Sequence, residues 1–440
     1  MSLNPQVKNM KILFDKLSEY RFVLIHIVFL LSGYTILHFL GVVNQVPNNY
    51  TIIKWDVGWF DSIRNSGYLF SNNSQSNVAS FPLFPYLWKI TGFTLIGISI
   101  LNYLFFLTGI IIICNTFHLK QYELLLMLSL PSAFFFYIPY SESLFFLFGS
   151  VLLSGYVKKN SYMIMIGLFL CSLTRAVSLT FIPAIFLVEI FSNDINKHGL
   201  IKTLKFSLLY FSIVVIGIAL VAFIQFKQTG IWFAFSKAQV FWAHKFQIPE
   251  FPLTTWDNWR LIWLDGTAFW VCILALIILI IKFVKKIISA KNEVKYSNKA
   301  YLFSLVYLSF FVFYSLFYCG KDPNGGTTLI CLNRYIFATP FFIIFFIDFI
   351  QSDNFSKIKY WGFLIFNILF WFLFGLYKPF NGWSMVSTLI YFLIISAYLQ
   401  VVLMFNSKNF IEKWWLGIYC LNLFLQIYLF NVFLNNIWVG

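Results

Sequence analysis

The chain has 440 residues, of which 60% are hydrophobic and 11% are charged. Because an average soluble domain carries roughly 25% charged residues, this composition excludes a soluble globular protein and an intrinsically disordered chain. The net charge of +15 comes from Lys and Arg residues spread between apolar segments without a nucleic-acid-binding motif, so we do not expect a nucleic-acid partner. We predict an all-α polytopic membrane protein whose residues 1–440 form one integral-membrane domain.

Apolar segments of roughly 20 residues, the length that crosses a bilayer, recur along the whole chain. Pro131 and Pro139 divide one long apolar stretch and Arg175 divides another; leaving both undivided gives eleven spans instead of thirteen. The thirteen predicted spans are 22–43, 92–113, 122–138, 140–157, 161–175, 176–192, 204–226, 266–284, 301–318, 333–350, 360–376, 384–405 and 414–434.

Positive charge favours thirteen spans and sets their orientation. Of the 31 Lys and Arg residues, 20 then fall on the side of the N-terminus and 11 on the other, and cytoplasmic loops carry the excess of basic residues. With eleven spans, Arg175 would lie near the middle of the membrane, which is costly. We therefore expect a cytoplasmic N-terminus, an external C-terminus, and outer loops at 44–91, 227–265 and 319–332.

The first outer loop contains the most informative residues. If residues 55–66 are helical, Asp56 shares an apolar face with Trp59, Phe60 and Ile63, whereas Asp61 lies on the polar face. A carboxylate held among aromatic rings is a candidate general base, because partial desolvation raises its pKa. Asp56 is equally well interpreted as an N-cap of this helix.

Three charged residues near the expected outer face are candidate site residues, and each also has an interpretation in terms of the helix dipole. Glu142 begins a span, where an acid suits the helix dipole, and Arg175 ends one, where a cation does. Arg334 stands at the start of a span, where a cation is disfavoured unless an anion lies beside it. That anion is a neighbouring acid, a lipid headgroup or a substrate phosphate.

The second outer loop contains an amphipathic stretch in which Gln239 and Trp242 lie on one helical face. These two side chains can hold a sugar, although aromatic residues near an interface are usually anchors. The 6 Cys and 5 His show no metal-ligand spacing, and no phosphate-binding loop is present. We therefore expect no metal and no nucleotide cofactor. Cys319 and Cys331 bracket one outer loop, where a disulfide is conceivable in an oxidising compartment.

The order of these motifs resembles that of the PIG-V-type mannosyltransferases. The first-loop motif is Trp55-Asp56, Gly67-Tyr68 and Phe81-Pro82-Leu83-Phe84-Pro85, and the resemblance covers about residues 50–340. Three later segments follow in the same order, namely Pro139-Tyr140-Ser141-Glu142-Ser143, Thr174-Arg175 and Leu332-Asn333-Arg334-Tyr335. The final three spans match nothing in this pattern.

The resemblance implies a GT-C fold with its active site on the outer or luminal face. It implies inverting transfer of mannose or a related hexose from a polyprenyl-phosphate-linked donor to a glycolipid or glycan acceptor. Asp56 would be the catalytic base, and Arg334 and Arg175 would bind the donor phosphate. We expect the substrates to contact Trp55, Trp59, Tyr68, Glu142, Gln239 and Trp242.

Two other functions remain open on the sequence alone. A secondary transporter or lipid-linked-sugar flippase shares this composition, although transporters usually place acids at mid-membrane between repeats. A GT-C transferase of another lipid-linked sugar is also compatible with the motifs. An Asn-, Lys-, Ile- and Phe-rich composition suggests a bacterial inner-membrane protein with a periplasmic site; a eukaryotic homologue would lie in the endoplasmic reticulum membrane.

Overall fold

The computed structural model describes residues 21–192, 197–257, 259–288, 298–322, 325–351, 357–404 and 408–440. Throughout these ranges the chain is dominated by helices, as the sequence predicts. Among them, α2, α5, α10, α12, α13 and α18 are long and apolar enough to cross a membrane. Shorter apolar helices lie beside them, so the prediction of a multi-pass membrane protein is confirmed by helix length and composition.

The first half of the chain contains both membrane-length helices and several short helices. In order, they are α2 (Arg21–Phe39), α3 (Asp56–Ser66), α4 (Leu83–Thr91), α5 (Leu95–Phe117), α6 (Gln121–Leu128), α7 (Glu142–Lys158), α8 (Ser161–Thr174), α9 (Phe181–Ser192) and α10 (Lys197–Thr229). Three 3₁₀ segments interrupt them: η1 (Asn77–Ala79), η2 (Pro131–Phe136) and η3 (Ala176–Thr180).

The second half contains three of the membrane-length helices, α12, α13 and α18, and a series of shorter ones. They are α11 (Ala234–Ala238), α12 (Trp259–Ile288), α13 (Lys299–Phe317), α14 (Leu332–Phe337), α15 (Pro340–Gln351), α16 (Lys357–Phe370), α17 (Met385–Met404) and α18 (Lys408–Leu434). The 3₁₀ segments are η4 (Gln239–Trp242) and η5 (Trp371–Phe374).

Every predicted span overlaps a helix, but several are divided, and two of these divisions shape the surroundings of Arg334. The segment 122–138 forms the eight-residue α6 followed by the 3₁₀ turn η2, because Pro131 has no N–H to continue the α-helical ladder. The segment 333–350 is split into α14 and α15 by a break before Pro340. This break leaves α14 as a short helix inside the protein, and α14 contains Arg334.

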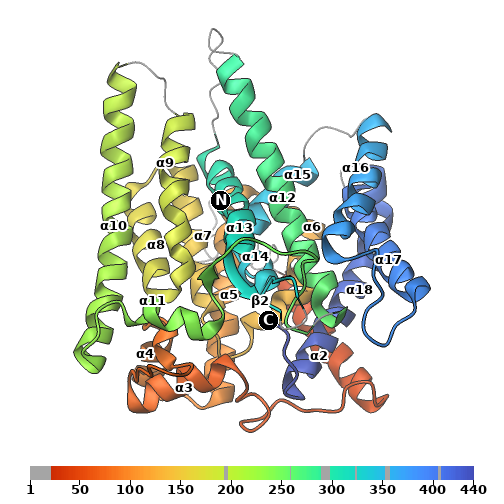
Figure 1. Cartoon of the computed structure of the whole chain (residues 1–440), viewed down its shortest axis with the longest axis horizontal. Helices are drawn as coiled ribbons and strands as arrows, with labels where there is room; N and C mark the ends of the chain where they lie inside the picture. The colour runs from red at the N-terminus through yellow and green to blue at the C-terminus, as the bar shows by residue number, and fades with distance from the viewer. Residues whose placement is uncertain are drawn as a thin grey trace, which may run out of the picture.

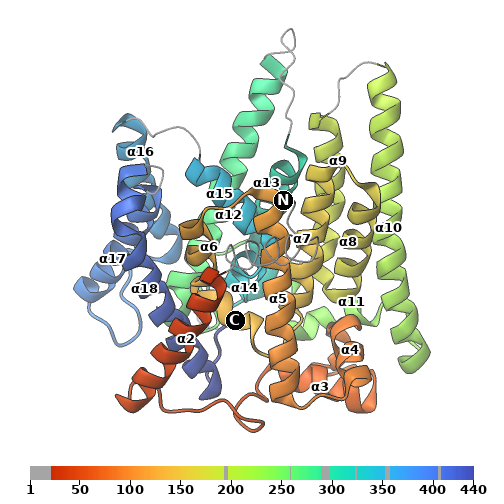
Figure 2. The same cartoon turned by 180° about the vertical axis from the view of Figure 1, so that it is seen from behind.

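The two ends of the helix bundle differ in structure and in charge (Figures 1 and 2). The short helices α3, α4 and α11 gather at the lower end, whereas the beginning of α10 and the end of α12 project from the upper end. The upper end has Lys202 and Lys205 on α10, and Lys282, Lys285 and Lys286 on α12. The outer-loop residues and the basic run thus lie at opposite ends, in the arrangement that the charge pattern predicts.

A strap formed by residues 243–257 crosses from α11 to α12 and is tied down by a small antiparallel sheet. Its strand β1 (Lys245–Phe246) pairs with β2 (Tyr318–Lys321), which pairs with β3 (Thr327–Thr328). Further along the strap, Thr254 N donates to Thr327 O at 2.9 Å, and Thr254 O accepts from Leu329 N at 2.8 Å. The strap therefore fixes the loop that leads into α14.

Candidate functional site

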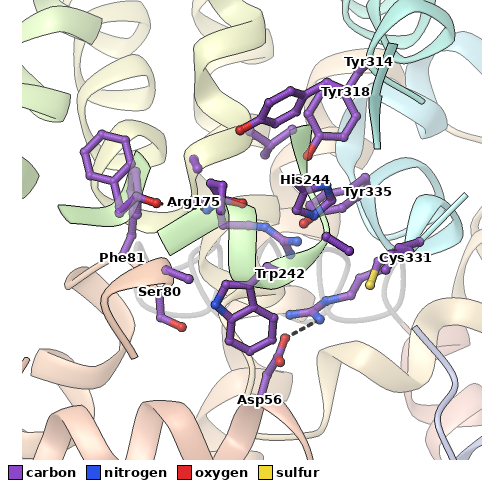
Figure 3. Close-up of a pocket in the computed structure, with 18 of the residues that line it drawn as sticks. Asp56, Ser80, Phe81, Arg175, Trp242, His244, Tyr314, Tyr318, Cys331 and Tyr335 are labelled. Atoms are coloured by element: carbon purple, nitrogen blue, oxygen red, sulfur yellow. Dashed lines mark hydrogen bonds and ion pairs between the residues drawn. The ribbon is translucent and has the colours of Figure 1, made fainter. Parts of the chain in front are cut away.

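A cavity of about 720 Å³ lies between α3, the strap, the end of α13 and α14. Its lining includes seven residues singled out from the sequence: Trp55, Asp56, Trp59, Arg175, Gln239, Trp242 and Arg334. Figure 3 shows side chains from several separate elements directed into this space. The volume of the cavity is in the range of small-molecule binding sites.

Helix α3 places Asp56 at the floor of the cavity. The helix begins at Asp56, and the preceding Trp55 has φ 51° and ψ −124° and makes no side-chain cap. A non-glycine residue with positive φ is strained, and such strain concentrates at functional sites. The Trp55 ring packs edge-on against Trp438, with centroids 4.9 Å apart. Because Asp56 is not the capping residue, the structure does not support its interpretation as an N-cap.

The Gly67-Tyr68 pair holds the far end of α3 against α10. Gly67 has φ 79°, and a Cβ atom there would lie 2.6 Å from Gln228 Oε1, so only glycine allows the close approach. Tyr68 N donates to the same Gln228 oxygen at 2.6 Å, and the Tyr68 hydroxyl donates to Ser80 O at 3.0 Å. Burial raises the pKa of Tyr68 well above its ordinary value. Tyr68 is thus buried behind the cavity wall and supports Ser80, which lines it.

An alternating cluster of two arginines and two carboxylates crosses the cavity floor. Arg334 Nη1 lies 2.6 Å from Asp56 Oδ2, while Arg334 Nε donates to Glu142. Arg175 pairs with the same Glu142 oxygen. The Glu142 side chain is fully buried, whereas that of Asp56 is 20% exposed. The anions predicted beside Arg334 are therefore Glu142 and Asp56 in this unliganded structure.

Aromatic rings hold both guanidinium groups in place. The Arg334 guanidinium carbon lies 4.3 Å from the centroid of Tyr140, and that of Arg175 lies 4.9 Å from the centroid of Tyr335. A cation over an aromatic face is favourable, and more so where water is excluded. The two side chains are only 6% and 9% exposed, so little water competes for their remaining N–H donors.

A further buried carboxylate, Asp265 near the N-terminal end of α12, fixes the start of α14. Asp265 Oδ1 accepts from both Asn333 N and Asn333 Nδ2 at 2.8 Å, and Asp265 Oδ2 accepts from the Thr255 hydroxyl at 2.5 Å. Thr255 belongs to the strap, so Asp265 joins the strap to the residue before Arg334. The sequence analysis missed this residue, which precedes the predicted span 266–284 by one position.

The opposite wall of the cavity is aromatic. Trp242 packs edge-on against Trp59 with centroids 5.5 Å apart, and Gln239 lies one turn before it in η4. His244 stacks on Tyr318 at 5.8 Å with an interplanar angle of 13°. Burial lowers the pKa of His244 from its ordinary value. Tyr335 of the Asn333-Arg334-Tyr335 segment lines the same region, together with Tyr314 and Tyr318, which the sequence analysis did not single out.

The remaining predicted residues lie elsewhere or have other partners. Glu142 and Tyr68 do not line the cavity, since each is buried behind a residue that does. Asp61 is 22% exposed, about as much as Asp56, and pairs with Arg64 at 2.7 Å. Cys319 and Cys331 are both free thiols, so the structure contains no disulfide between them. Within the described ranges, no group of three or more His, Cys, Asp or Glu side chains is arranged to hold a metal ion.

No protein-family model, no curated protein and no solved structure matches the chain.

Proposed function

We propose that the protein is a membrane glycosyltransferase with a GT-C fold that uses a polyprenyl-phosphate-linked hexose, with mannose as the first candidate sugar. Asp56 acts as the general base, and Arg334 and Arg175 bind the phosphate of the donor. The acceptor is the hydroxyl of a glycolipid or glycan at the outer face of the membrane.

The observation that carries this proposal is the unequal placement of the two carboxylates on Arg334. Glu142 is sealed between two arginines, so it balances one of their positive charges permanently. Asp56 balances the second charge from the cavity side and is still accessible. When an anionic group binds both arginines from the cavity, it takes over the charge balance that Asp56 provides, and Asp56 becomes free to accept a proton.

The proposed reaction conserves charge within this cluster. The acceptor hydroxyl gives its proton to Asp56, and its oxygen bonds to the anomeric carbon of the donor sugar. The bond from that carbon to the phosphate oxygen breaks, and the electron pair stays on the phosphate, which becomes a dianion. The two arginines stabilise the developing charge from fixed positions, the arrangement that makes electrostatic catalysis effective. Attack opposite the phosphate inverts the anomeric configuration.

The rest of the lining is compatible with a lipid-linked sugar. Gln239, Trp59 and Trp242 offer an amide and two indole rings near Asp56. Beyond Arg175, the lining changes to apolar residues of η3 and α13, including Leu179 and Phe313, which are 44% and 52% exposed. In a membrane protein, exposed apolar side chains on a spanning helix face lipid, so the cavity is open to the place where a lipid tail resides.

The direct test is product analysis. Purified protein is incubated with polyprenyl-phosphate-mannose and extracted membrane lipids, and the products are examined by mass spectrometry for a hexose added to an acceptor. Hexose transfer that is lost in Asp56→Asn supports the proposal. If the donor is moved across a reconstituted bilayer without being consumed, the protein is a flippase and the proposal is wrong.

A second experiment tests the side of the membrane. Cysteine introduced at Ser74, in the first outer loop, should react with an impermeant thiol reagent applied to intact cells. Cysteine at Lys158, which is exposed at the opposite end of α7, should react only after the cells are permeabilised. The matched background replaces Cys420, the exposed native thiol. The reverse labelling pattern would place the cavity on the cytoplasmic side.

A further inference from the structure

Three tyrosines continue the cavity beyond the arginines, on the side away from Asp56. The Tyr335 ring lies under Arg175 at 4.9 Å, Tyr314 lies 6.4 Å from Tyr335, and Tyr318 lies 5.5 Å from Tyr314. Asp56 contacts the other arginine, Arg334. Figure 3 shows the same order, with Asp56 on one side of Arg175 and the three rings on the other. We name Tyr314, Tyr318 and Tyr335 the tyrosine cluster.

The hydroxyls of the tyrosine cluster have no partner among the described residues, although all three side chains line the cavity. The three side chains are partly exposed rather than buried, so their hydroxyls are open to the cavity and can donate to a bound ligand. The stacked His244 ring helps to fix the Tyr318 plane. Three neutral donors are therefore held in position without a protein acceptor.

The helix that contains Tyr314 and ends just before Tyr318 also lines the apolar end of the cavity. Tyr314 lies on α13 and Tyr318 directly follows it, while Phe310, Phe313 and Phe317 from the same two turns also line the cavity. Phe313 and Phe317 are among the exposed hydrophobic residues of the protein. The hydroxyls thus stand at a boundary, with two arginines on one side and lipid-facing phenylalanines on the other.

A displacement reaction fixes the order in which a lipid donor must lie along this path. The acceptor hydroxyl is at Asp56, the sugar follows, then the phosphate at the arginines, and then the tail. The junction between phosphate and tail therefore falls at the tyrosine cluster. Part of each guanidinium is already occupied by Glu142 or Asp56, and a phosphate accepts hydrogen bonds on several sides, so hydroxyl donors on the tail side add to the contacts that the arginines make.

We propose that the tyrosine cluster donates hydrogen bonds to the phosphate of the lipid-linked sugar, on the side where the apolar tail is attached. The cluster thereby selects a sugar that is carried on an isoprenoid phosphate. This inference rests on the proposed function and adds to it three phosphate-binding residues. Neutral hydroxyls suit this position, because they bind the phosphate without adding a third positive charge to a cluster whose charges already balance.

The test compares two sugar-free probes with the same tail, farnesyl phosphate and farnesol. Binding to wild type, Tyr318→Phe and Tyr335→Phe is measured by titration in detergent, and each substitution removes one hydroxyl while keeping its ring. The control is Tyr428→Phe, which changes an exposed tyrosine on α18 outside the cavity. We expect each cluster variant to bind farnesyl phosphate roughly tenfold more weakly, as for the loss of one hydrogen bond to a charged group, with farnesol binding unchanged.

Each result has a defined meaning. Equal weakening for phosphate and alcohol, or no weakening for either, overturns the role of the tyrosine cluster. If Arg334→Met abolishes the preference for phosphate while the Tyr→Phe variants keep it, the arginine site stands and only this inference fails. If wild type and Arg334→Met bind both probes alike, the phosphate site of the proposed function fails as well.

Discussion

Arg334 is bound by carboxylates from two regions of the protein, and those regions differ in how far they exclude water. At the start of α7, Glu142 has a fully buried side chain shared by two arginines. At the start of α3, Asp56 reaches the same arginine from the cavity and keeps 20% of its side chain exposed. A charge that is buried and doubly paired is suited to holding a structure, whereas one that is singly paired and accessible can exchange its partner for a substrate.

The largest expected effect is on catalysis at the accessible end. Asp56→Asn keeps the size of the side chain and an oxygen that accepts from Arg334, but it removes the proton acceptor. We expect transfer to fall by roughly 10²–10⁴-fold, while the melting temperature stays close to that of wild type. The measurement is the initial rate of hexose transfer at saturating donor, alongside thermal unfolding. Near-normal turnover would remove Asp56 from the mechanism.

The next largest effect is expected at the buried end, and it concerns stability. Glu142→Gln leaves two buried arginines facing a neutral amide, and breaking a buried ion pair costs about 3–5 kcal/mol. We expect a large fall in the denaturation midpoint. Glu250→Gln is the control, because the Glu250–Lys321 pair is about half exposed, and such pairs contribute about 0–1 kcal/mol. Similar midpoints for the two variants would contradict the structural role of Glu142.

Much of the charge arrangement around Arg334 can be predicted from the sequence. The apolar face of 55–66 separates Asp56 from Asp61 because helical periodicity is local, and the structure has the helix α3 at this place. The helix dipole predicts an anion beside Arg334 from its position alone. The basic runs predict which loops share one end of the bundle, because loops joined by spans alternate between its two ends.

The parts that sequence reasoning missed depend on contacts between distant segments. The tyrosine cluster joins the end of α13 to α14, and hydroxyls on an apolar helix have no periodic signal. Trp438 lines the cavity from the segment that follows α18. The last three predicted spans, which precede it, lie outside the part of the chain that resembles the mannosyltransferases. Asp265 is a buried carboxylate bound only by neutral donors, and next to a predicted span it resembles an ordinary interfacial acid.

A smaller effect is expected when the shape of the shared arginine changes but its charge does not. Arg334→Lys keeps the positive charge but loses the fork that contacts Glu142 and Asp56 together. We expect roughly tenfold slower transfer, the equivalent of one lost hydrogen bond to a charged group, with most of the loss in donor affinity. The rate measured as a function of donor concentration checks this. A lysine variant with wild-type donor affinity would show that the fork is unnecessary.

The smallest effect is expected for Asp61→Asn, five residues from Asp56 on the same helix. The two acids are similarly exposed, at 22% and 20%, so burial alone does not distinguish them; their partners do. Asp61 pairs with Arg64 one turn away and accepts from Asn65 at 3.0 Å, and such a local pair contributes about 0.3–0.5 kcal/mol. We expect transfer within about threefold of wild type, because Asp61 does not line the cavity and its local pair contributes little to stability. The same rate and unfolding measurements apply as for Asp56→Asn. If Asp61→Asn loses as much activity as Asp56→Asn, the contact with Arg334 is not what makes a carboxylate of α3 functional, and the assignment of the base must be abandoned.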